Sequence, residues 1–467
     1  MKHYDIVVIG SGSGGLTSAY TALGFGKKVL VINKGLPGGE CTWSGCIPSK
    51  ALINEAKKIH TARSVVGTLE YSTEKAMHVV KNVIEKVYEG ESIEKLEADG
   101  IDFIQGHARF TSPNEVLVNG QRIQANKFVI STGSSPLKPP IPGIDETPYL
   151  DNESLFELNA LPKSIIILGG GAIGVEMAQA MNRLGVKVDL VEMADHILIR
   201  EEKEYSERLQ DILKSEGVKI HVNTKATAMS KRGDKVYLSV EPGAGPSDGE
   251  TTELEADEIL LAIGRTPNLY NLGLDEAGIE YDKRRIKVNA YMQTSQKHIY
   301  AVGDVAGPYL FSHMANVQGI QAIQNACLPI KRKVKDKHVA WTTFSEPELA
   351  RAGMTEAEAR DKFGDTIRVY DFDFDHLDRA MTKGASKEGV KIVLDARGKV
   401  LGASILADRA GEMISEIQLL KTMNKNFSSL AGVIHPYPTY GEVFSKIAKK
   451  VAVDNILNNP LVKLFRK

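Results

Sequence analysis

Cysteine is scarce in this sequence, and so are long apolar segments. The chain holds three cysteines in 467 residues, which is too few for a secreted scaffold held together by disulfides. It contains no run of about 20 apolar residues, so no transmembrane helix is expected. The apolar run behind the N-terminus ends at Gly10, too early for a signal peptide. These absences predict a cytoplasmic protein without an integral membrane segment.

An excess of charge of either sign is also absent. The 58 Lys and Arg residues and the 59 Asp and Glu residues leave a net charge of −1, whereas a dedicated nucleic-acid binder carries a basic excess. Hydrophobic residues make up 42% of the chain and charged residues 25%, which is typical of a globular protein with a large core. A chain of this length divides into about three domains. We therefore expect a multidomain globular protein that does not bind nucleic acid.

Glycine, in contrast, is abundant and gathers in two short turns. Residues 4–33 and 164–192 each read as a strand, a glycine-rich turn, a helix and a second strand. In such a turn the first glycine permits the tight bend, the second lets a pyrophosphate approach the backbone, and the third lets the helix pack on the sheet. The three positions are Gly10, Gly12 and Gly15 in the first segment, and Gly169, Gly171 and Gly174 in the second. The sequence thus predicts an α/β protein with two Rossmann-like dinucleotide-binding units.

The residue that ends the second strand of each unit is placed to reach a ribose. In the second unit this residue is Glu192, and a carboxylate there accepts hydrogen bonds from both ribose hydroxyls and repels a 2′-phosphate. We therefore expect NADH to be favoured over NADPH. The equivalent position of the first unit holds Asn33, followed by Lys34. An amide can still hydrogen-bond a ribose, so both residues are candidate cofactor contacts.

Composition divides the rest of the chain. Five prolines between residues 136 and 148 indicate a linker, residues 51–98 favour helices, and residues 241–252 read as a hairpin loop. From about residue 339, alternating strands such as 390–394 precede a helix near 412–423, which predicts a separate α+β domain. The predicted domain ranges are 1–148, 149–270, 271–338 and 339–467, with 1–148 and 271–338 as two parts of one domain.

Two of the three cysteines lie five residues apart. Cys41 and Cys46 precede Pro48, where a helix is expected to begin, and a helix N-terminus lowers the pKa of a thiol. Such a pair can cycle between disulfide and dithiol. The other interpretations are an inert buried pair and half of a zinc site, but no second ligand pair is visible, so no metal is expected. Cys327 stands alone and is interpreted as a core residue.

The segment 38–50, which contains Gly39, both cysteines and Lys50, resembles the redox-disulfide signature of the pyridine nucleotide–disulfide oxidoreductases. That family includes dihydrolipoamide dehydrogenase, glutathione reductase and mercuric reductase. Four further segments resemble family motifs in the family's order: 131–133, 262–268, 300–304 and 344–350. The resemblance implies that the first unit, completed by residues 271–338, binds FAD, that residues 149–270 bind NAD(P)H, and that residues 339–467 form a homodimer interface. The additional cofactor contacts that it implies are Gly39, Lys50, Thr132, Gly133, Gly264, Arg265, Gly303 and Asp304.

The resemblance also implies a route for electrons. Cys46 is expected against the flavin as the charge-transfer thiolate, and Cys41 is expected to meet the substrate. Lys50 is expected near flavin N5, paired with Glu176. Electrons then pass from NADH to FAD, to the cysteine pair, and to a disulfide, thiol or electrophile acceptor.

The C-terminal region departs from the family's disulfide reductases. They carry a catalytic histidine from the partner subunit in a His-Pro-x-x-x-Glu pattern, and aligning Pro438 and Glu442 puts Tyr437 in its place. A tyrosine is a poor base at neutral pH because its pKa is near 10. His435, two residues upstream, is the alternative base. Mercuric reductases also place a tyrosine here, but they end in a cysteine pair that this chain does not have.

Three acceptor hypotheses follow. The first is an activity like that of dihydrolipoamide dehydrogenase, on a disulfide or thiol. The second is reduction of a soft metal or another electrophile, like that of mercuric reductase. The third is a slow-turnover redox sensor or electron-transfer protein that acts on a partner protein.

Overall fold

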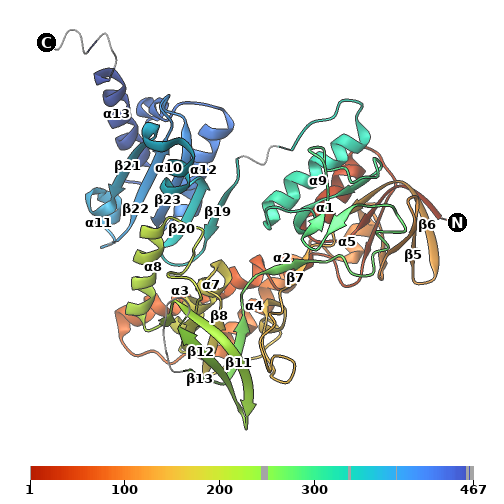
Figure 1. Ribbon diagram of the computed structural model, residues 1–467, viewed down its shortest axis with the longest axis horizontal. Coiled ribbons are helices and arrows are strands. Elements are labelled where there is room, and N and C mark those ends of the chain that lie inside the picture. The colour runs from red at the N-terminus through yellow and green to blue at the C-terminus, as the bar shows by residue number, and fades with distance from the viewer. Residues whose placement is uncertain (1, 243–250, 335–337, 385–386, 459–461, 463–467) are drawn as a thin grey trace.

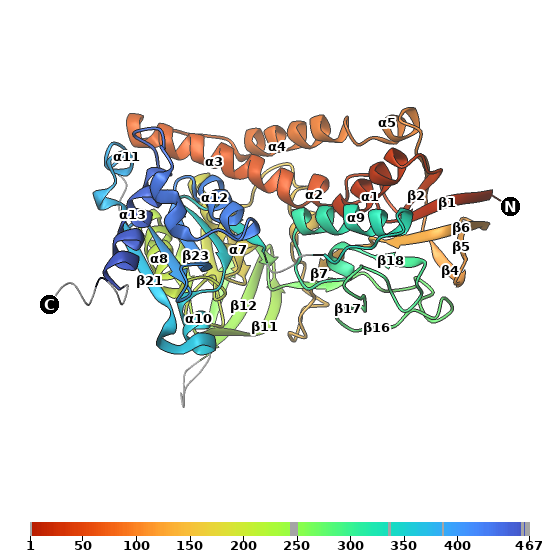
Figure 2. The same ribbon diagram turned by 90° about the horizontal axis from the view of Figure 1, so that it is seen from above.

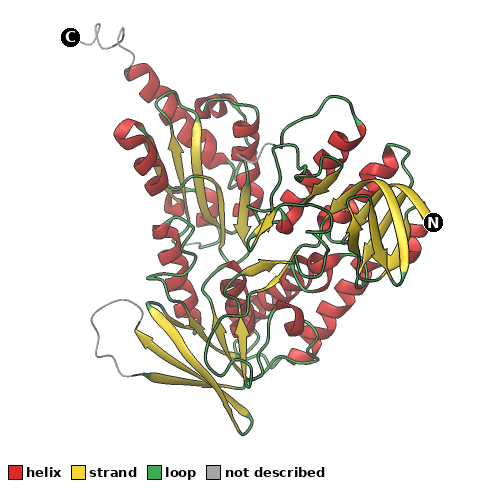
Figure 3. Cartoon of the chain, turned by 45° about the vertical axis from the view of Figure 1, so that its right-hand side comes forward, coloured by secondary structure: helices red, strands yellow, loops and turns green. Residues whose placement is uncertain are grey.

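The computed structural model describes residues 2–242, 251–334, 338–384, 387–458 and 462 (Figure 1). Its strands and helices form three units, each built around a sheet of its own (Figure 3). No helix in these described ranges is long and apolar enough to span a bilayer.

The first unit is built on a seven-stranded sheet with the order β3-β2-β1-β6-β5-β4, in which β18 also pairs with β6. The central strand β1 (Lys2–Ile9) is parallel to β2, β6 and, across β6, to β18, as expected of a nucleotide-binding sheet. Its apolar run is buried: α1 packs on it with α9 against α1, and the same core includes side chains of β4, β5 and the segment 272–292. The other elements of this unit are α1 (Ser13–Gly24), β2 (Val29–Asn33), α5 (Ile93–Ala98), β3 (Asp102–Gln105), β4 (Arg109–Ser112), β5 (Glu115–Val118), β6 (Gln121–Ile130), β16 (Tyr281–Asp282), β17 (Arg285–Ile286), β18 (Ile299–Ala301), η1 (Gly303–Val305) and α9 (Ser312–Cys327).

The second unit repeats the pattern on a smaller parallel sheet with the order β10-β9-β8-β14. A three-stranded antiparallel sheet, β11-β12-β13, lies beside it, and its strands bound the loop predicted at 241–252, of which residues 243–250 lie outside the described part. The elements are α6 (Asn152–Leu155), β8 (Ser164–Leu168), α7 (Ala172–Arg183), β9 (Lys187–Val191), α8 (Lys203–Glu216), β10 (Lys219–His221), β11 (Thr224–Arg232), β12 (Lys235–Pro242), β13 (Thr252–Ala256) and β14 (Glu258–Leu261). A two-stranded pair, β7 (Ser134–Pro136) with β15 (Arg265–Pro267), joins the first two units.

The third unit is an antiparallel five-stranded sheet with the order β19-β20-β23-β22-β21 and with helices on its faces. The expected alternation in 390–394 is wrong: all six residues of β22 (Gly389–Leu394) are buried, because α12 covers one face and α10 the other. The remaining elements are β19 (Ala340–Thr343), β20 (Glu348–Gly353), α10 (Glu356–Phe363), η2 (Gly364–Thr366), β21 (Arg368–Asp373), η3 (Phe374–His376), α11 (Asp378–Met381), β23 (Val400–Ala407), α12 (Ala410–Thr422), η4 (Phe427–Gly432) and α13 (Glu442–Leu457). The helix expected near 412–423 is therefore α12.

Long helices connect the units. After the short α2 (Gly39–Trp43), α3 (Cys46–Val66) leaves the first unit and runs to the third, with α4 (Thr73–Tyr88) beside it (Figure 2). Helix α3 also packs along α7 of the second unit. A single helix that begins at Cys46 thus contacts elements of all three units.

Candidate active site

The first glycine turn is shaped to receive a phosphate. Gly10 has a φ of +101°, and a Cβ there would lie 2.3 Å from the carbonyl oxygen of Ser131. A Cβ on Gly15 would lie 2.0 Å from the carbonyl oxygen of Gly10, so the helix can approach the strand only without a side chain. Gly12 is the N-cap of α1 and has no side chain that could accept a hydrogen bond. The N–H groups of the first turn of α1 are therefore available to a phosphate.

The second turn repeats these features. Gly169 has a φ of +114°, and a Cβ on Gly174 would lie 1.9 Å from the Gly169 carbonyl oxygen. Gly171 is the uncapped N-cap of α7, and a Cβ there would meet no atom within 4 Å. This open space in front of a helix N-terminus suits a pyrophosphate.

The two ribose positions differ in what their side chains do. The carboxylate of Glu192 accepts hydrogen bonds from the N–H of Gly170 at 2.6 Å and from the N–H of Ala194 at 2.8 Å. Its orientation is thereby fixed at the end of β9. Asn33 Oδ1 likewise accepts from the first glycine turn, from the N–H of Ser11 at 3.3 Å, but its amide nitrogen also donates to the carbonyl oxygens of Gly35 and Leu36. Lys34, next to it, is exposed.

Polar contacts join the C-terminal ends of the first unit's strands to β15. Thr132 Oγ1 donates to the carbonyl oxygen of Asn268 at 2.8 Å, and the Asn268 N–H donates to the carbonyl oxygen of Gly133 at 3.0 Å. At the end of β18, Gly303 has a φ of +74°, and its N–H donates to Gln318 Oε1. The first two bonds hold segment 132–133 against Asn268, which follows β15, and the third holds Gly303 against α9.

Arg265 lies between two carboxylates. It follows Gly264, which has a φ of +133°, and forms a bidentate ion pair with Glu40, the residue before Cys41. Its Nε donates to Ser134 Oγ, and that hydroxyl donates to Asp304 Oδ2 at 2.5 Å. Burial raises the pKa of Glu40 to about 7, although Arg265 acts in the opposite direction.

The two cysteines are thiols here and lie at a helix start. Cys41 is on α2 and Cys46 is the first residue of α3, while Gly39 packs so tightly on Gly12 that a Cβ would lie 2.4 Å from its Cα. The hydrogen bond from Cys41 lowers the pKa of Cys46 to about 6, with further lowering by Ser312 and Lys50. The pKa of Cys41 is raised, because it holds the proton that it shares with Cys46. The lower pKa of the pair thus falls on Cys46.

Ser312 from a distant element and Lys50 from α3 itself act on Cys46. The hydroxyl of Ser312, the first residue of α9, lies 3.5 Å from its Sγ. Lys50, one helical turn along α3, donates to Glu176 Oε2 at 2.8 Å, so the expected Lys50–Glu176 contact is present. Glu176 is 5% exposed, and its other oxygen accepts from the N–H of Phe344 at 2.8 Å.

The two candidate bases near the C-terminus, Tyr437 and His435, differ in their exposure to solvent. Tyr437 is 69% exposed, and its hydroxyl donates to Asp378 Oδ2 at 2.8 Å, which raises the pKa of Tyr437. His435 is partly covered and its Nε2 lies 3.1 Å from Glu416 Oε1. Glu442 begins α13, where it lies 3.4 Å from Lys446. Among the described residues, neither aromatic ring is hydrogen-bonded to Glu442.

Comparison with known proteins decides what this arrangement is. Residues 4–328 match the family described as pyridine nucleotide-disulphide oxidoreductase, and residues 339–448 match the dimerisation domain of that family. The chain belongs to the pyridine nucleotide-disulphide oxidoreductase family. It is therefore a disulfide oxidoreductase that uses FAD and a pyridine nucleotide, and its dimerisation domain supports a homodimer.

Several members of the family are similar along nearly the whole chain. The dihydrolipoyl dehydrogenase of Thermus scotoductus is 36% identical over 96% of this chain and 97% of its own length. The mercuric reductase of Bacillus cereus is 31% identical over 94% of this chain and 70% of its own length. The Cu(II) complex of the HOCl-induced flavoprotein disulfide reductase RclA from Escherichia coli superposes with a TM-score of 0.86 at 29% identity, covering 97% of this chain and all of that one. The expected fold class and the expected resemblance are confirmed.

The residues fit the family's cofactors. In each glycine turn the first and third glycines stand where a Cβ would clash with the backbone, so the tight turn needs glycine there. Each turn leads into a helix of twelve residues whose N-terminus has no side-chain cap and is available to a phosphate. In the described ranges, no group of three or more His, Cys, Asp or Glu side chains is arranged to hold a metal ion.

Sequence reasoning missed four residues of this region. Ser312 has a local signal, because a serine often marks a helix start. Glu40 also has one, since a carboxylate stands inside a glycine-rich turn beside a reactive cysteine. Asp378 and the backbone of Phe344 carry no signal in the sequence, because only the packing of the third unit brings them to Tyr437 and Glu176.

Proposed function

We propose that the protein uses NADH to reduce a disulfide or a soft electrophile, with Cys41 and Cys46 as the redox pair. The observation that carries this proposal is the pair itself: one thiol with a lowered pKa begins α3, and the other holds the shared proton. When bound, FAD would accept a hydride from NADH and pass two electrons to the cysteine pair. The cofactor contacts and residue roles named from the sequence, including those of Asp304, Arg265 and Lys50, belong to this proposal.

With a disulfide acceptor, the chemistry of the reduced pair balances in two exchanges. The Cys41 sulfur attacks one acceptor sulfur, the acceptor S–S bond breaks, and the leaving thiol takes a proton. The Cys46 thiolate then attacks Cys41, releases the second acceptor thiol and restores the Cys41–Cys46 disulfide. One disulfide and one NADH with a proton thus give two thiols and NAD⁺.

The first exchange requires Cys41 to lose its proton, which is where the C-terminal loop matters. In the proposed homodimer, Tyr437 of one subunit faces Cys41 of the other. Its raised pKa and its hydrogen bond to Asp378 make it a donor and not a base at neutral pH. His435 is less suited, because it is partly covered and engaged with Glu416.

Because neither Tyr437 nor His435 is well suited as the base, a second acceptor class gains support. A soft metal ion or electrophile that binds sulfur displaces the thiol proton itself, so its reduction needs no positioned base. A mercuric-reductase-like activity on such an acceptor is therefore the second candidate. The copper complex of the E. coli flavoprotein disulfide reductase is an example of a metal bound to a similar protein.

The nucleotide preference and the compartment complete the proposal. The fixed carboxylate of Glu192 suits the two ribose hydroxyls of NADH and repels a 2′-phosphate. The cysteine pair must be reduced by NADH before each turnover. This requirement suits the cytoplasm, where thiols are kept reduced.

An anaerobic titration of the holoenzyme with NADH tests the route. A long-wavelength charge-transfer band at two electrons per flavin is the expected result, and Cys41→Ser should abolish disulfide reduction. Bleaching of the flavin without that band would show that the pair is bypassed. Steady-state assays with lipoamide, glutathione disulfide, Hg(II) and Cu(II) then rank the acceptors, and slow turnover with all of them would favour the redox-sensor alternative.

A further inference from the structure

Segment 344–346 of the third unit contacts both α3 and α7. Three side chains on one face of α7 hold it: Glu176, Gln179 and Arg183, which are three and seven residues apart. The N–H of Phe344 donates to Glu176 Oε1, and the N–H of Glu346 donates to Gln179 Oε1 at 2.7 Å. Gln179 Nε2 returns a bond to the Glu346 carbonyl oxygen at 2.8 Å. The backbone of this segment is thus fixed along the helix.

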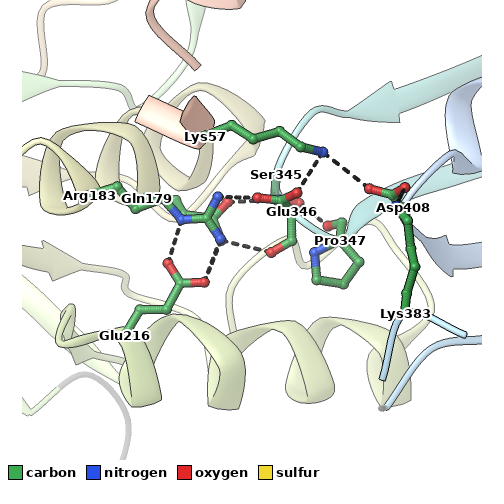
Figure 4. A network of polar contacts seen from close by, with 9 residues as sticks. All are labelled: Lys57, Gln179, Arg183, Glu216, Ser345, Glu346, Pro347, Lys383 and Asp408. Atoms are coloured by element: carbon green, nitrogen blue, oxygen red, sulfur yellow. Dashed lines mark hydrogen bonds and ion pairs between the residues drawn. The ribbon is translucent and has the colours of Figure 1, made fainter. Parts of the chain in front are cut away.

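The carboxylate of Glu346 anchors the segment at its other end (Figure 4). It forms an ion pair with Arg183, whose side chain is 6% exposed and which also binds Glu216 at 2.6 Å. It also pairs with Lys57 of α3 at 2.5 Å, and Lys57 reaches Asp408 of the third unit at 3.1 Å. Arg183 is the most buried member of these pairs, whereas the Lys57 side chain is 45% exposed and the Glu346 side chain is 28% exposed, so the anchor is fixed mainly from the side of α7.

Phe344, Glu176 and Lys50 all contact one another. Its N–H binds one oxygen of Glu176, the ammonium of Lys50 binds the other, and that ammonium lies 4.5 Å from the centre of the Phe344 ring. A ring face attracts a cation at this distance. Lys50 is on α3, four residues after Cys46, so its charge is directed to the thiol by the same helix.

We propose that Phe344 is a positioning residue for Lys50, which it holds against Glu176 and one helical turn from Cys46. The side chain of Lys50 is 36% exposed, so without the ring its ammonium is free to turn towards solvent. The thiolate of Cys46 then loses part of a nearby positive charge. Because the segment belongs to the third unit, the docking of that unit on α3 and α7 tunes the redox pair. This inference rests on the proposed route of electrons through the cysteine pair.

Site-resolved alkylation of the dithiol-reduced holoenzyme tests the proposal. Initial rates of iodoacetamide labelling at Cys46, measured by mass spectrometry across pH, give the midpoint at which the thiolate forms. Phe344→Leu keeps the N–H and the apolar bulk but removes the ring face, and it should raise this midpoint by about 0.5 pH unit. Phe344→Tyr keeps the ring and should restore the wild-type midpoint. Glu346→Gln loosens the anchor without touching the ring and should shift the midpoint in the same direction.

A matched control is available on α10. Phe363 is 39% exposed and its ring lies 5.4 Å from Lys362 Nζ, so Phe363→Leu removes the same kind of contact outside segment 344–346. A midpoint for Phe344→Leu equal to that of Phe363→Leu would overturn the proposal, as would an equal shift in Phe344→Tyr. The readout needs no turnover. A missing charge-transfer band in the wild type would reject the proposed function, while the midpoints would still decide the role of Phe344.

Discussion

The hydroxyl of Tyr437 donates a hydrogen bond to the carboxylate of Asp378. The residue at the position of the family's catalytic histidine is thus paired with an acid 59 residues upstream and not with Glu442, five residues downstream. An acidic acceptor for its proton keeps Tyr437 a phenol at neutral pH, because the pKa of Tyr437 is raised.

Replacing the phenol by an imidazole should supply the missing base. We expect Tyr437→His to raise kcat/KM for lipoamide about tenfold or more, because a positioned general base contributes about 10² to 10⁴ in rate. Asp378 remains in place to orient the ring. The measurement is steady-state lipoamide reduction, with Tyr437→Phe as the control that removes the hydroxyl alone. An unchanged kcat/KM would show that a base is not what limits this acceptor.

The lowered pKa of Cys46 predicts a pH dependence for the reduced enzyme. Because the charged form is the thiolate, it persists above the pKa of about 6 and is lost as the pH falls through that value. Long-wavelength absorbance of the two-electron-reduced holoenzyme should therefore disappear between about pH 7 and pH 5. A midpoint near the ordinary thiol value of about 8.5 would contradict the assignment of Cys46 as the thiolate.

Removal of the Ser312 hydroxyl should weaken that thiolate. The hydroxyl lies 3.5 Å from Cys46 Sγ and contributes to the lowered pKa of Cys46. In Ser312→Ala we expect the midpoint to rise by about 0.5 to 1 unit, the effect of one hydrogen bond to a charged group. Ser312→Thr retains a hydroxyl and serves as the comparison. If both variants shift equally, the effect comes from packing and not from the hydrogen bond.

Glu192 should determine the preference for the nucleotide. Glu192→Ala removes the carboxylate that is fixed by the N–H groups of Gly170 and Ala194. We expect kcat/KM for NADH to fall about tenfold, in line with about 1.5 kcal/mol for a charged hydrogen bond, while kcat/KM for NADPH falls less or rises. Parallel assays with both nucleotides give the ratio. An equal loss for both would mean that Glu192 acts on the loop and not on the ribose.

Removing Arg265 from its ion pair with Glu40 should lower the free energy of unfolding. Arg265 is 12% exposed and Glu40 30%, so Arg265→Ala leaves a largely covered carboxylate without its cation. We expect a loss of about 1 to 3 kcal/mol in the free energy of unfolding, because partial exposure lowers the cost of an unpaired charge. Urea unfolding measures it. The double variant Arg265→Ala with Glu40→Gln should recover part of the loss; additive losses would show that the two residues act independently.

Much of the fold was visible in short stretches of sequence. The two glycine turns and the cysteine-to-Pro48 segment predicted the helix starts at Ser13, Ala172 and Cys46 within a few residues. These features depend on local causes, namely φ above zero, the missing Cβ and the helix N-terminus. The alternation expected in 390–394 failed, because helices α10 and α12 from elsewhere in the chain cover both faces of β22.

The sequence by itself determined the family, the two glycine turns and the cysteine pair at a helix start, because each depends on residues that are neighbours along the chain. Tertiary structure alone decided which charges face these groups. Glu40 meets Arg265 across 225 residues, and Phe344 meets Glu176 across 168. Such contacts depend on how whole sheets and helices pack, and packing is set by the shapes of many side chains at once. For the same reason, only the tertiary structure decides that Tyr437 pairs with Asp378, the first residue of α11.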